Sequence, residues 1–185
     1  MMRGEAMIKY LPTYMGATIY DLDFAKLYAL HKKNIIMDLD NTLIPYTKCE
    51  ADDALLKWHK RLKELGFHLY IASNNNDQRI VQFSKTFPLD GFLTKAGKPK
   101  ADKLLAFMEE HHLKASETIM LGDQILTDIA AANNAGIDSI LVTSIDKTSQ
   151  KWYTKINRIR ERKIIKKLYD EDPIKAKELE NIIGG

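Results

Sequence analysis

Four acidic residues in two clusters carry the chemistry that this sequence suggests. Asp38 and Asp40 stand two positions apart in Asp-Leu-Asp-Asn-Thr, so at the end of a strand their carboxylates would project toward the same side. Crowded carboxylates repel unless a cation neutralises them or one of them holds a proton. Asp123 and Asp128 form a second cluster after Gly122, and the four acids together would make an oxygen-rich site suited to Mg²⁺. Taken alone, either cluster could instead be a loop start or a helix cap.

Three further polar residues suit an oxyanion such as phosphate. Lys98 follows Gly97 in a loop and offers a compact positive charge for phosphate oxygens, although a loop lysine is commonly only solvated. Ser73 and Asn74 offer hydroxyl, amide and backbone donors at the end of a strand, a set that also suits a tight turn.

A second Asp-Leu-Asp run, Asp21 to Asp23, has a different interpretation. It lacks a preceding apolar strand and comes just before the helical pattern of Phe24, Leu27 and Tyr28. We therefore expect Asp21 or Asp23 to cap a helix and to take no part in the site.

Short apolar runs that alternate with helical patterns must position these residues. The apolar runs predict strands over 34–37, 67–72, 118–122 and 139–142, with a short element at 91–93. Helical spacing and stop signals predict helices over 51–65, 77–85, 99–112 and 127–135. Strands separated by such helices form a parallel, doubly wound α/β sheet, which binds ligands beyond the carboxyl ends of its strands. The candidate residues follow those ends, which favours a functional site.

Size and composition exclude several classes of protein. A chain of 185 residues and 21.2 kDa, with 45% hydrophobic and 29% charged residues, is typical of one globular domain and not of a disordered or collagen-like chain. No apolar run approaches the roughly 18–20 residues of a membrane span, and we expect no secretion signal. The lone Cys49 cannot form an internal disulfide and is interpreted as an incidental small residue, so a reducing cytoplasmic compartment is expected.

The net charge of +3 conceals a basic tail. Residues 147–167 hold nine Lys or Arg and one acid, Glu161, for +8, which leaves −5 for the rest. We accordingly expect an N-terminal extension (1–33), a core (34–146) and a helical tail (147–185). The tail could contact an anionic membrane surface, with Trp152 and Tyr153 at the interface, or it could be a solvated charged helix. Nucleic acid is a weaker candidate because no RNA motif with interleaved aromatic residues accompanies the charge.

The tail is poorly amphipathic if it forms one helix. Trp152, Ile156 and Ile159 would share one face, whereas Ile164, Ile165 and Leu168 would lie nearly opposite. The pattern predicts either a break near 160–163 or a helix with one face packed on the body.

The motifs in order resemble those of the haloacid dehalogenase-like (HAD) phosphatases. The resemblance covers about residues 34–143 and runs through Met37-Asp38-Leu39-Asp40-Asn41-Thr42-Leu43, then Ser73, then Lys98-Pro99, and finally Gly122-Asp123 with Asp128. More narrowly, the chain resembles the YqeG-type branch of subclass IIIA, which is related to mitochondrial phosphatidylglycerophosphate phosphatases. This resemblance runs through Asp40-Asn41-Thr42-Leu43-Ile44-Pro45 and the stretch 122–128, and it includes an upstream segment from Leu11-Pro12 to Asp23 and a downstream Asn157-Arg158.

The resemblance implies a role for each motif residue within a Rossmann-like HAD fold. Asp38 would be the nucleophile that forms an aspartyl-phosphate, and Asp40 would protonate the leaving group and then activate water. Mg²⁺ would be held by Asp38, the Asp40 carbonyl and Asp123, and Asp128 would either orient these ligands or bind the metal itself. The catalytic Lys98, together with Thr42, Ser73 and Asn74, would hold the transferring oxygens.

The spacing of the motifs leaves no room for a cap domain. Residues 40–73 and 73–98 each allow about one helix with its connections, whereas a separate domain needs roughly 50 residues or more. An open, capless site suits a large substrate. We expect a Mg²⁺-dependent phosphomonoester hydrolase, with phosphatidylglycerophosphate as substrate, in the cytoplasm and peripheral to the inner face of the membrane. The alternatives are a phosphoprotein or nucleotide phosphatase, or a non-catalytic module that binds RNA or protein through its tail.

Overall fold

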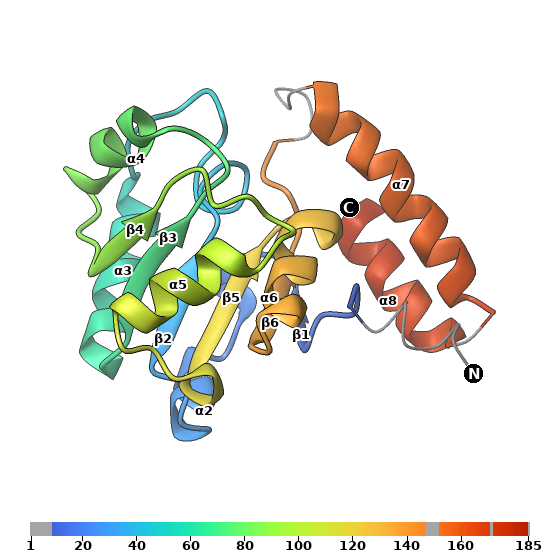
Figure 1. The fold of residues 1–185 in the computed structure, drawn as a ribbon, viewed down its shortest axis with the longest axis horizontal. Coiled ribbons are helices and arrows are strands. Elements are labelled where there is room, and N and C mark those ends of the chain that lie inside the picture. The colour runs from blue at the N-terminus through green and yellow to red at the C-terminus, as the bar shows by residue number, and fades with distance from the viewer. Residues whose placement is uncertain (1–8, 147–151, 171, 185) are drawn as a thin grey trace.

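The computed structural model describes residues 9–146, 152–170 and 172–184 (Figure 1). The strands are β1 (Tyr14–Gly16), β2 (Asn34–Met37), β3 (His68–Ala72), β4 (Gly91–Leu93), β5 (Thr118–Gly122) and β6 (Asp138–Val142). The α-helices are α2 (Phe24–Ala29), α3 (Asp53–Leu65), α4 (Asp77–Ser84), α5 (Asp102–Glu110), α6 (Ala130–Asn134), α7 (Trp152–Leu168) and α8 (Pro173–Gly184).

One parallel sheet organises the chain, in the order β1-β6-β5-β2-β3-β4. The strand β2 lies between β3 and β5, and all four of its residues are buried, as expected for a strand covered on both faces. The expected doubly wound α/β fold is confirmed, and no cap domain interrupts the motifs between β2 and β5.

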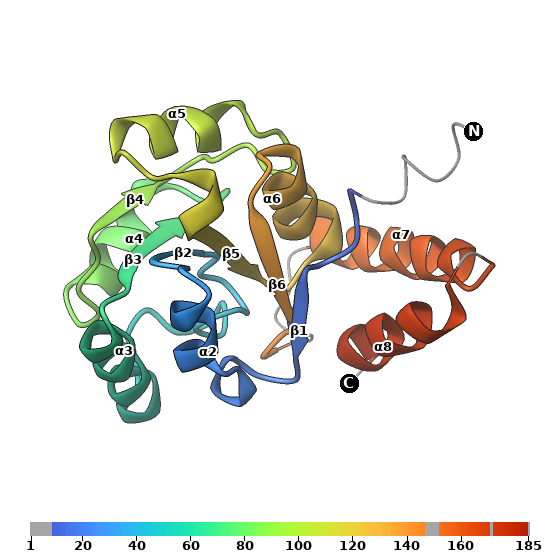
Figure 2. The same ribbon diagram turned by 90° about the horizontal axis from the view of Figure 1, so that it is seen from below.

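Helices cover both faces of the sheet (Figure 2). Alternate residues of β2 divide between two cores, with Ile35 and Met37 packed beside α2, α3 and α4 and with Ile36 packed beside α5 and α6. Because both faces of β2 pack against apolar cores, its sequence is a continuous apolar run.

Two helix starts differ most from the expectation. The helix α5 begins at Asp102 and not at Pro99, because a turn from Gly97 to Lys100 comes first, closed by the Lys100 amide on the Gly97 carbonyl at 3.0 Å. The helix expected over 127–135 begins as a π-helical turn over Ile125–Ile129 and continues as α6. The carboxylate of Asp128 accepts from the Gln124 amide at 3.0 Å at the start of this wider turn.

The segment before β2 adds an edge strand and a short helix. The strand β1 pairs with β6, and Asp23 caps α2 by accepting from the Lys26 amide at 3.0 Å. Asp21 accepts from Thr18 in a separate cap. The prediction that this Asp-Leu-Asp run is a cap is therefore confirmed.

The tail forms a helical hairpin on the sheet. The helix α7 is unbroken, and Ile165 and Leu168 are buried with residues of α8 and of the π-helical turn, so one face packs on the body. Ile159 is exposed, whereas the side chains of 152–156 lie outside those described. Among the described residues, no helix is long and apolar enough to span a bilayer.

Candidate active site

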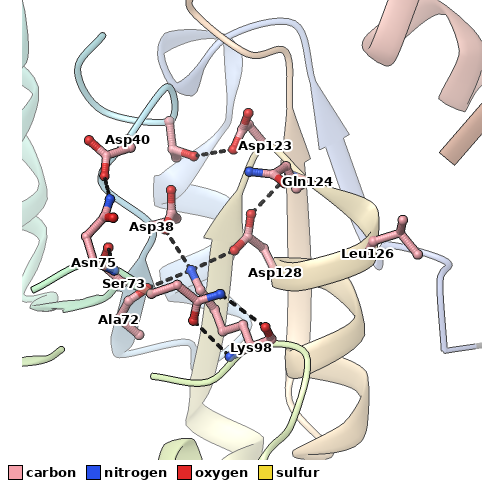
Figure 3. A network of polar contacts seen from close by, with 12 residues as sticks. Asp38, Asp40, Ala72, Ser73, Asn75, Lys98, Asp123, Gln124, Leu126 and Asp128 are labelled. Carbon is pink, nitrogen blue, oxygen red and sulfur yellow. Dashed lines mark hydrogen bonds and ion pairs between the residues drawn. The ribbon is translucent and has the colours of Figure 1, made fainter. Parts of the chain in front are cut away.

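The candidate residues converge at the carboxyl edge of the sheet (Figure 3). Asp38 directly follows β2, Ser73 follows β3 and Asp123 follows β5. Met37 is level with Ile71 of β3 and Leu121 of β5, so the three strands end at nearly the same height. The shared register therefore brings together residues that are 35 to 85 positions apart.

Lys98 lies buried between two aspartates. Its Nζ is 2.7 Å from Asp38 Oδ1, 2.7 Å from Asp128 Oδ1 and 2.7 Å from the Ala72 carbonyl oxygen. Burial alone would lower the pKa of Lys98, but the charges of Asp128 and Asp38 raise it above its ordinary value, so the ammonium stays charged. Burial raises the pKa of Asp38 to about 8, and the Asp128 and Asp123 charges add to the rise while Lys98 opposes it.

Three buried carboxylates form a set that fits a divalent cation. One oxygen from each of Asp38, Asp123 and Asp128 lies within 4.8 Å of the other two. The three carboxylates and the Lys98 ammonium, which contacts Asp38 and Asp128, together carry a formal charge of −2, which a divalent ion would neutralise. Oxygen ligands of this kind are those that Mg²⁺ prefers. At Gly122 an added Cβ would overlap the Asp128 side chain, so the close approach requires glycine.

The Asp40 carboxylate lies outside this set and has its own partners. Arg79 Nε is 2.5 Å from Asp40 Oδ1, and the Asn75 amide donates to Oδ2. The turn that follows Asp38 is closed by the Asn41 amide on the Ile44 carbonyl at 2.7 Å, with Asn41 at φ 64°, a left-handed conformation that asparagine tolerates. Asp40 is thus held beside the cavity by Asn75 of the loop after β3 and by Arg79 of α4.

Arg79 was not identified from the sequence. Its guanidinium also donates to the Pro45 carbonyl at 3.1 Å, contacts Cys49 Sγ at 3.5 Å and lies over the Tyr46 ring at 5.0 Å. The available signal was weak: Arg79 is the only basic residue of α4, next to the run of asparagines after β3. Asn75 was missed within that same run.

The three expected phosphate contacts other than Lys98 have different surroundings. The hydroxyl of Thr42 is 3.3 Å from Asp123 Oδ1, and Thr42 does not line the cavity, so it orients a carboxylate. The Asn74 amide binds the backbone of Lys98 in both directions, at 2.9 Å and 3.1 Å. The Ser73 hydroxyl accepts a hydrogen bond from the backbone N–H of Asn75 at 3.1 Å, and Ser73 lines the cavity.

The site opens into a cavity of about 490 Å³. Its wall includes Asp38, Asp40, Lys98 and Ser73 on the sheet side. The wall also includes Tyr10, Asn157 and Arg160, which come from outside the motifs. The tail helix α7 therefore contributes directly to the candidate site.

The chain is similar in sequence or in fold to several known proteins. The HAD-hydrolase-like family model matches residues 95–170. Probable phosphatase YqeG of Bacillus subtilis (strain 168) is 34% identical over 159 residues, which is 86% of this chain and 91% of the relative. An uncharacterized protein from Listeria monocytogenes serotype 4b has a similar fold, with a TM-score of 0.51 and 18% identity over 64% of this chain and 85% of that one. The 3-deoxy-D-manno-octulosonate 8-phosphate phosphatase of Moraxella catarrhalis, solved with magnesium, phosphate and KDO, has a TM-score of 0.48 and 16% identity over 78% and 92%.

Proposed function

This chain belongs to the HAD-like phosphatases, in the branch of YqeG, and from that premise we propose that it hydrolyses phosphatidylglycerophosphate through an aspartyl-phosphate on Asp38. The observation that carries the proposal is the convergence of Asp38, Lys98 and the carboxylates of Asp123 and Asp128 at one open cavity. Phosphoryl transfer depends mainly on positioning and charge neutralisation, and this arrangement supplies both.

The proposed reaction has two steps. In the first, an Asp38 oxygen forms a bond to phosphorus while the bond to the leaving alkoxide breaks, and Asp40 gives that alkoxide its proton. In the second, Asp40 takes a proton from water as the water oxygen attacks phosphorus, which releases inorganic phosphate and restores the Asp38 carboxylate. Arg79 and Asn75 hold Asp40 for this exchange.

The remaining residues balance charge and hold ligands. Lys98 offsets the negative charge that gathers between Asp38 and the phosphate. The Ser73 hydroxyl contacts a phosphate oxygen, Asn74 fixes the backbone of Lys98, and Thr42 orients Asp123. This assignment revises the expected phosphate contacts of Thr42 and Asn74.

The carboxylate set is proposed to hold Mg²⁺. Asp38, Asp123 and the backbone carbonyl of Asp40 would be its ligands, and Asp128, whose two oxygens already meet Gln124 and Lys98, completes the negative charge. When bound, the ion neutralises charge on the carboxylates and on the phosphate oxygens.

The lipid assignment draws on the open site and on the positive charge along α7. No cap domain shields the cavity, so a headgroup at a membrane surface can reach it without leaving the lipid layer. Lys163, Lys166 and Lys167 are exposed on neighbouring positions of α7 and would attract an anionic leaflet by about 1 kcal/mol each. We therefore propose a cytoplasmic enzyme that works at the inner face of the membrane.

The test is phosphate release from phosphatidylglycerophosphate in mixed micelles, beside nucleotides and phosphopeptides, with and without Mg²⁺. We expect the lipid to be preferred, and Asp38→Asn to lower turnover by about a thousandfold or more. Asp23→Asn is the matched control, because it changes the other Asp-Leu-Asp run and asparagine caps a helix equally well.

Two outcomes would change the assignment. Turnover of a nucleotide or phosphopeptide with none of the lipid would move the substrate to that class and leave the mechanism intact. If Asp38→Asn kept full biological function while neutral replacements of Arg158, Arg160 and Arg162 abolished it, the chain would act as a binding module through its tail.

A further inference from the structure

We infer that Arg160 and Asn157 of α7 form a subsite for a second anionic group of the substrate. This inference rests on the proposed function, because it assumes that the phosphomonoester end of the substrate sits at Asp38. Both residues line the same cavity as Asp38 and Lys98, although they come from α7 and not from any of the four motifs. The helix would thereby select among phosphomonoesters, a task that a cap domain could perform in a larger enzyme.

The distribution of ion pairs around the cavity supports this subsite. Lys98 contacts Asp38 and Asp128, and Arg79 contacts Asp40, so these two cations are committed to carboxylates of the site. Among the described residues, no carboxylate forms an ion pair with Arg160. Its guanidinium is therefore available for a ligand, and it can bind two oxygens of a phosphate group at once.

Asn157 and Arg160 are placed to act together. They are three residues apart on α7 and so share one side of the helix. The asparagine amide adds a neutral hydrogen-bond donor next to the guanidinium. This combination suits a phosphodiester or a second phosphate better than an uncharged sugar.

The helix is fixed to the turn that carries Asp128. Glu161, adjacent to Arg160, is fully buried, and its Oε1 accepts from the Leu126 amide at 3.3 Å. Four residues further on, Ile165 packs in the same core as Ile125 of that turn. Because the same turn bears Asp128 and anchors α7, the distance between the two ends of the cavity is set by packing.

A pair of headgroup fragments separates the subsite from general charge effects. Glycerophosphoglycerophosphate carries a phosphomonoester and a phosphodiester, whereas glycerol 3-phosphate carries the same monoester alone. We expect Arg160→Ala to lower kcat/KM for glycerophosphoglycerophosphate by about tenfold or more, mainly by raising KM. A loss of this size corresponds to one charge-assisted hydrogen bond. The same substitution should change kcat/KM for glycerol 3-phosphate by less than about twofold.

Arg162→Ala is the matched control. Arg162 is also an exposed arginine of α7 but lies about 200° around the helix and lines a different cavity beside α8. Micellar phosphatidylglycerophosphate forms a third arm, which shows whether the acylated lipid and the free headgroup depend on Arg160 to the same degree.

A binding measurement keeps the test independent of turnover. In the Asp38→Asn background, calorimetry with glycerophosphoglycerophosphate should show an approximately tenfold weaker Kd after Arg160→Ala and little change after Arg162→Ala. Wild type that binds this compound through Arg160 but releases no phosphate would reject the proposed function and support the subsite. The subsite would be overturned if Arg160→Ala lowered kcat/KM equally for both headgroup fragments or for neither. It would also be overturned if Arg162→Ala lowered kcat/KM or affinity for glycerophosphoglycerophosphate as much as Arg160→Ala does.

Discussion

Replacing Lys98 by methionine tests how much of the stability of the protein depends on the charges in the site. Lys98 Nζ has three oxygen partners at 2.7 Å, and its side chain is only 2% exposed. Methionine keeps the approximate length of the side chain but leaves three buried carboxylates without their cation. Removing one partner of a buried charge pair costs about 3–5 kcal/mol, and for a chain of this size each kcal/mol lowers Tm by about 2–4 °C.

We therefore expect metal-free Lys98→Met to unfold roughly 6–20 °C below wild type at about pH 9, above the Asp38 pKa of about 8. Adding Asp38→Asn to this variant removes one of the three like charges and should restore more than half of the loss, as a double-mutant cycle would show. Lys100→Met, at an exposed lysine two residues away, is the control and should change Tm by less than about 2 °C. Calorimetry that finds Lys98→Met as stable as wild type, or the double variant no better than the single, would refute the electrostatic account.

Three further predictions follow from contacts and pKa shifts in or beside the site. Arg79→Gln should lower kcat by about tenfold to a hundredfold, because Asp40 loses its charged partner, and a variant with unchanged kcat in steady-state assays would contradict this role. The pKa of Asp38 is about 8 in the folded protein, against an ordinary value near 3.9 in the unfolded chain. Between these pH values the metal-free folded protein holds a proton that the unfolded chain has released, so the Tm of the protein should fall as the pH rises from about 5 to 8. Since Mg²⁺ must displace that proton, its addition should raise Tm more at about pH 8.5 than at about pH 5.5, and an equal effect at both would count against a metal site at Asp38. Burial alone would raise the pKa of Asp90, but hydrogen bonds from the Leu69 amide and from Lys63 lower it, so the carboxylate stabilises the fold above about pH 4. Asp90→Asn should accordingly lower the free energy of unfolding in urea by about 1 kcal/mol at neutral pH, and by progressively less as the pH falls through the lowered pKa. A difference between variant and wild type that stays constant with pH would show that charge is not the cause.

The fold and the main site residues were predictable because they follow from local patterns. The apolar run before Asp38 and the run before Asp123 are each short and continuous, as buried parallel strands require, and parallel strands bring their carboxyl ends to one edge. The convergence of Asp38 and Asp123 needed no knowledge of long-range contacts beyond that rule, whereas Lys98, in the loop after β4, was expected at the site from the motif resemblance.

Other features depend on contacts that no local pattern reports. Arg79 reaches Asp40 across 39 positions, and Glu161 reaches Leu126 across 35. The sequence suggested that α7 would either break or pack one face on the body, and only tertiary packing decides between these. Arg160 was noticed for its charge, but its place in the cavity wall follows from how α7 docks on the turn before α6.

The most direct measurement of the central claim is the identity of the phosphorylated residue. Wild type mixed with phosphatidylglycerophosphate and Mg²⁺ would be quenched during turnover and treated with borohydride, which reduces an aspartyl-phosphate to homoserine, before peptide mass spectrometry. The account predicts homoserine at position 38 and none at Asp40, Asp123 or Asp128, with no conversion in Asp38→Asn. Steady phosphate release with unmodified Asp38, or with conversion at another aspartate, would contradict it.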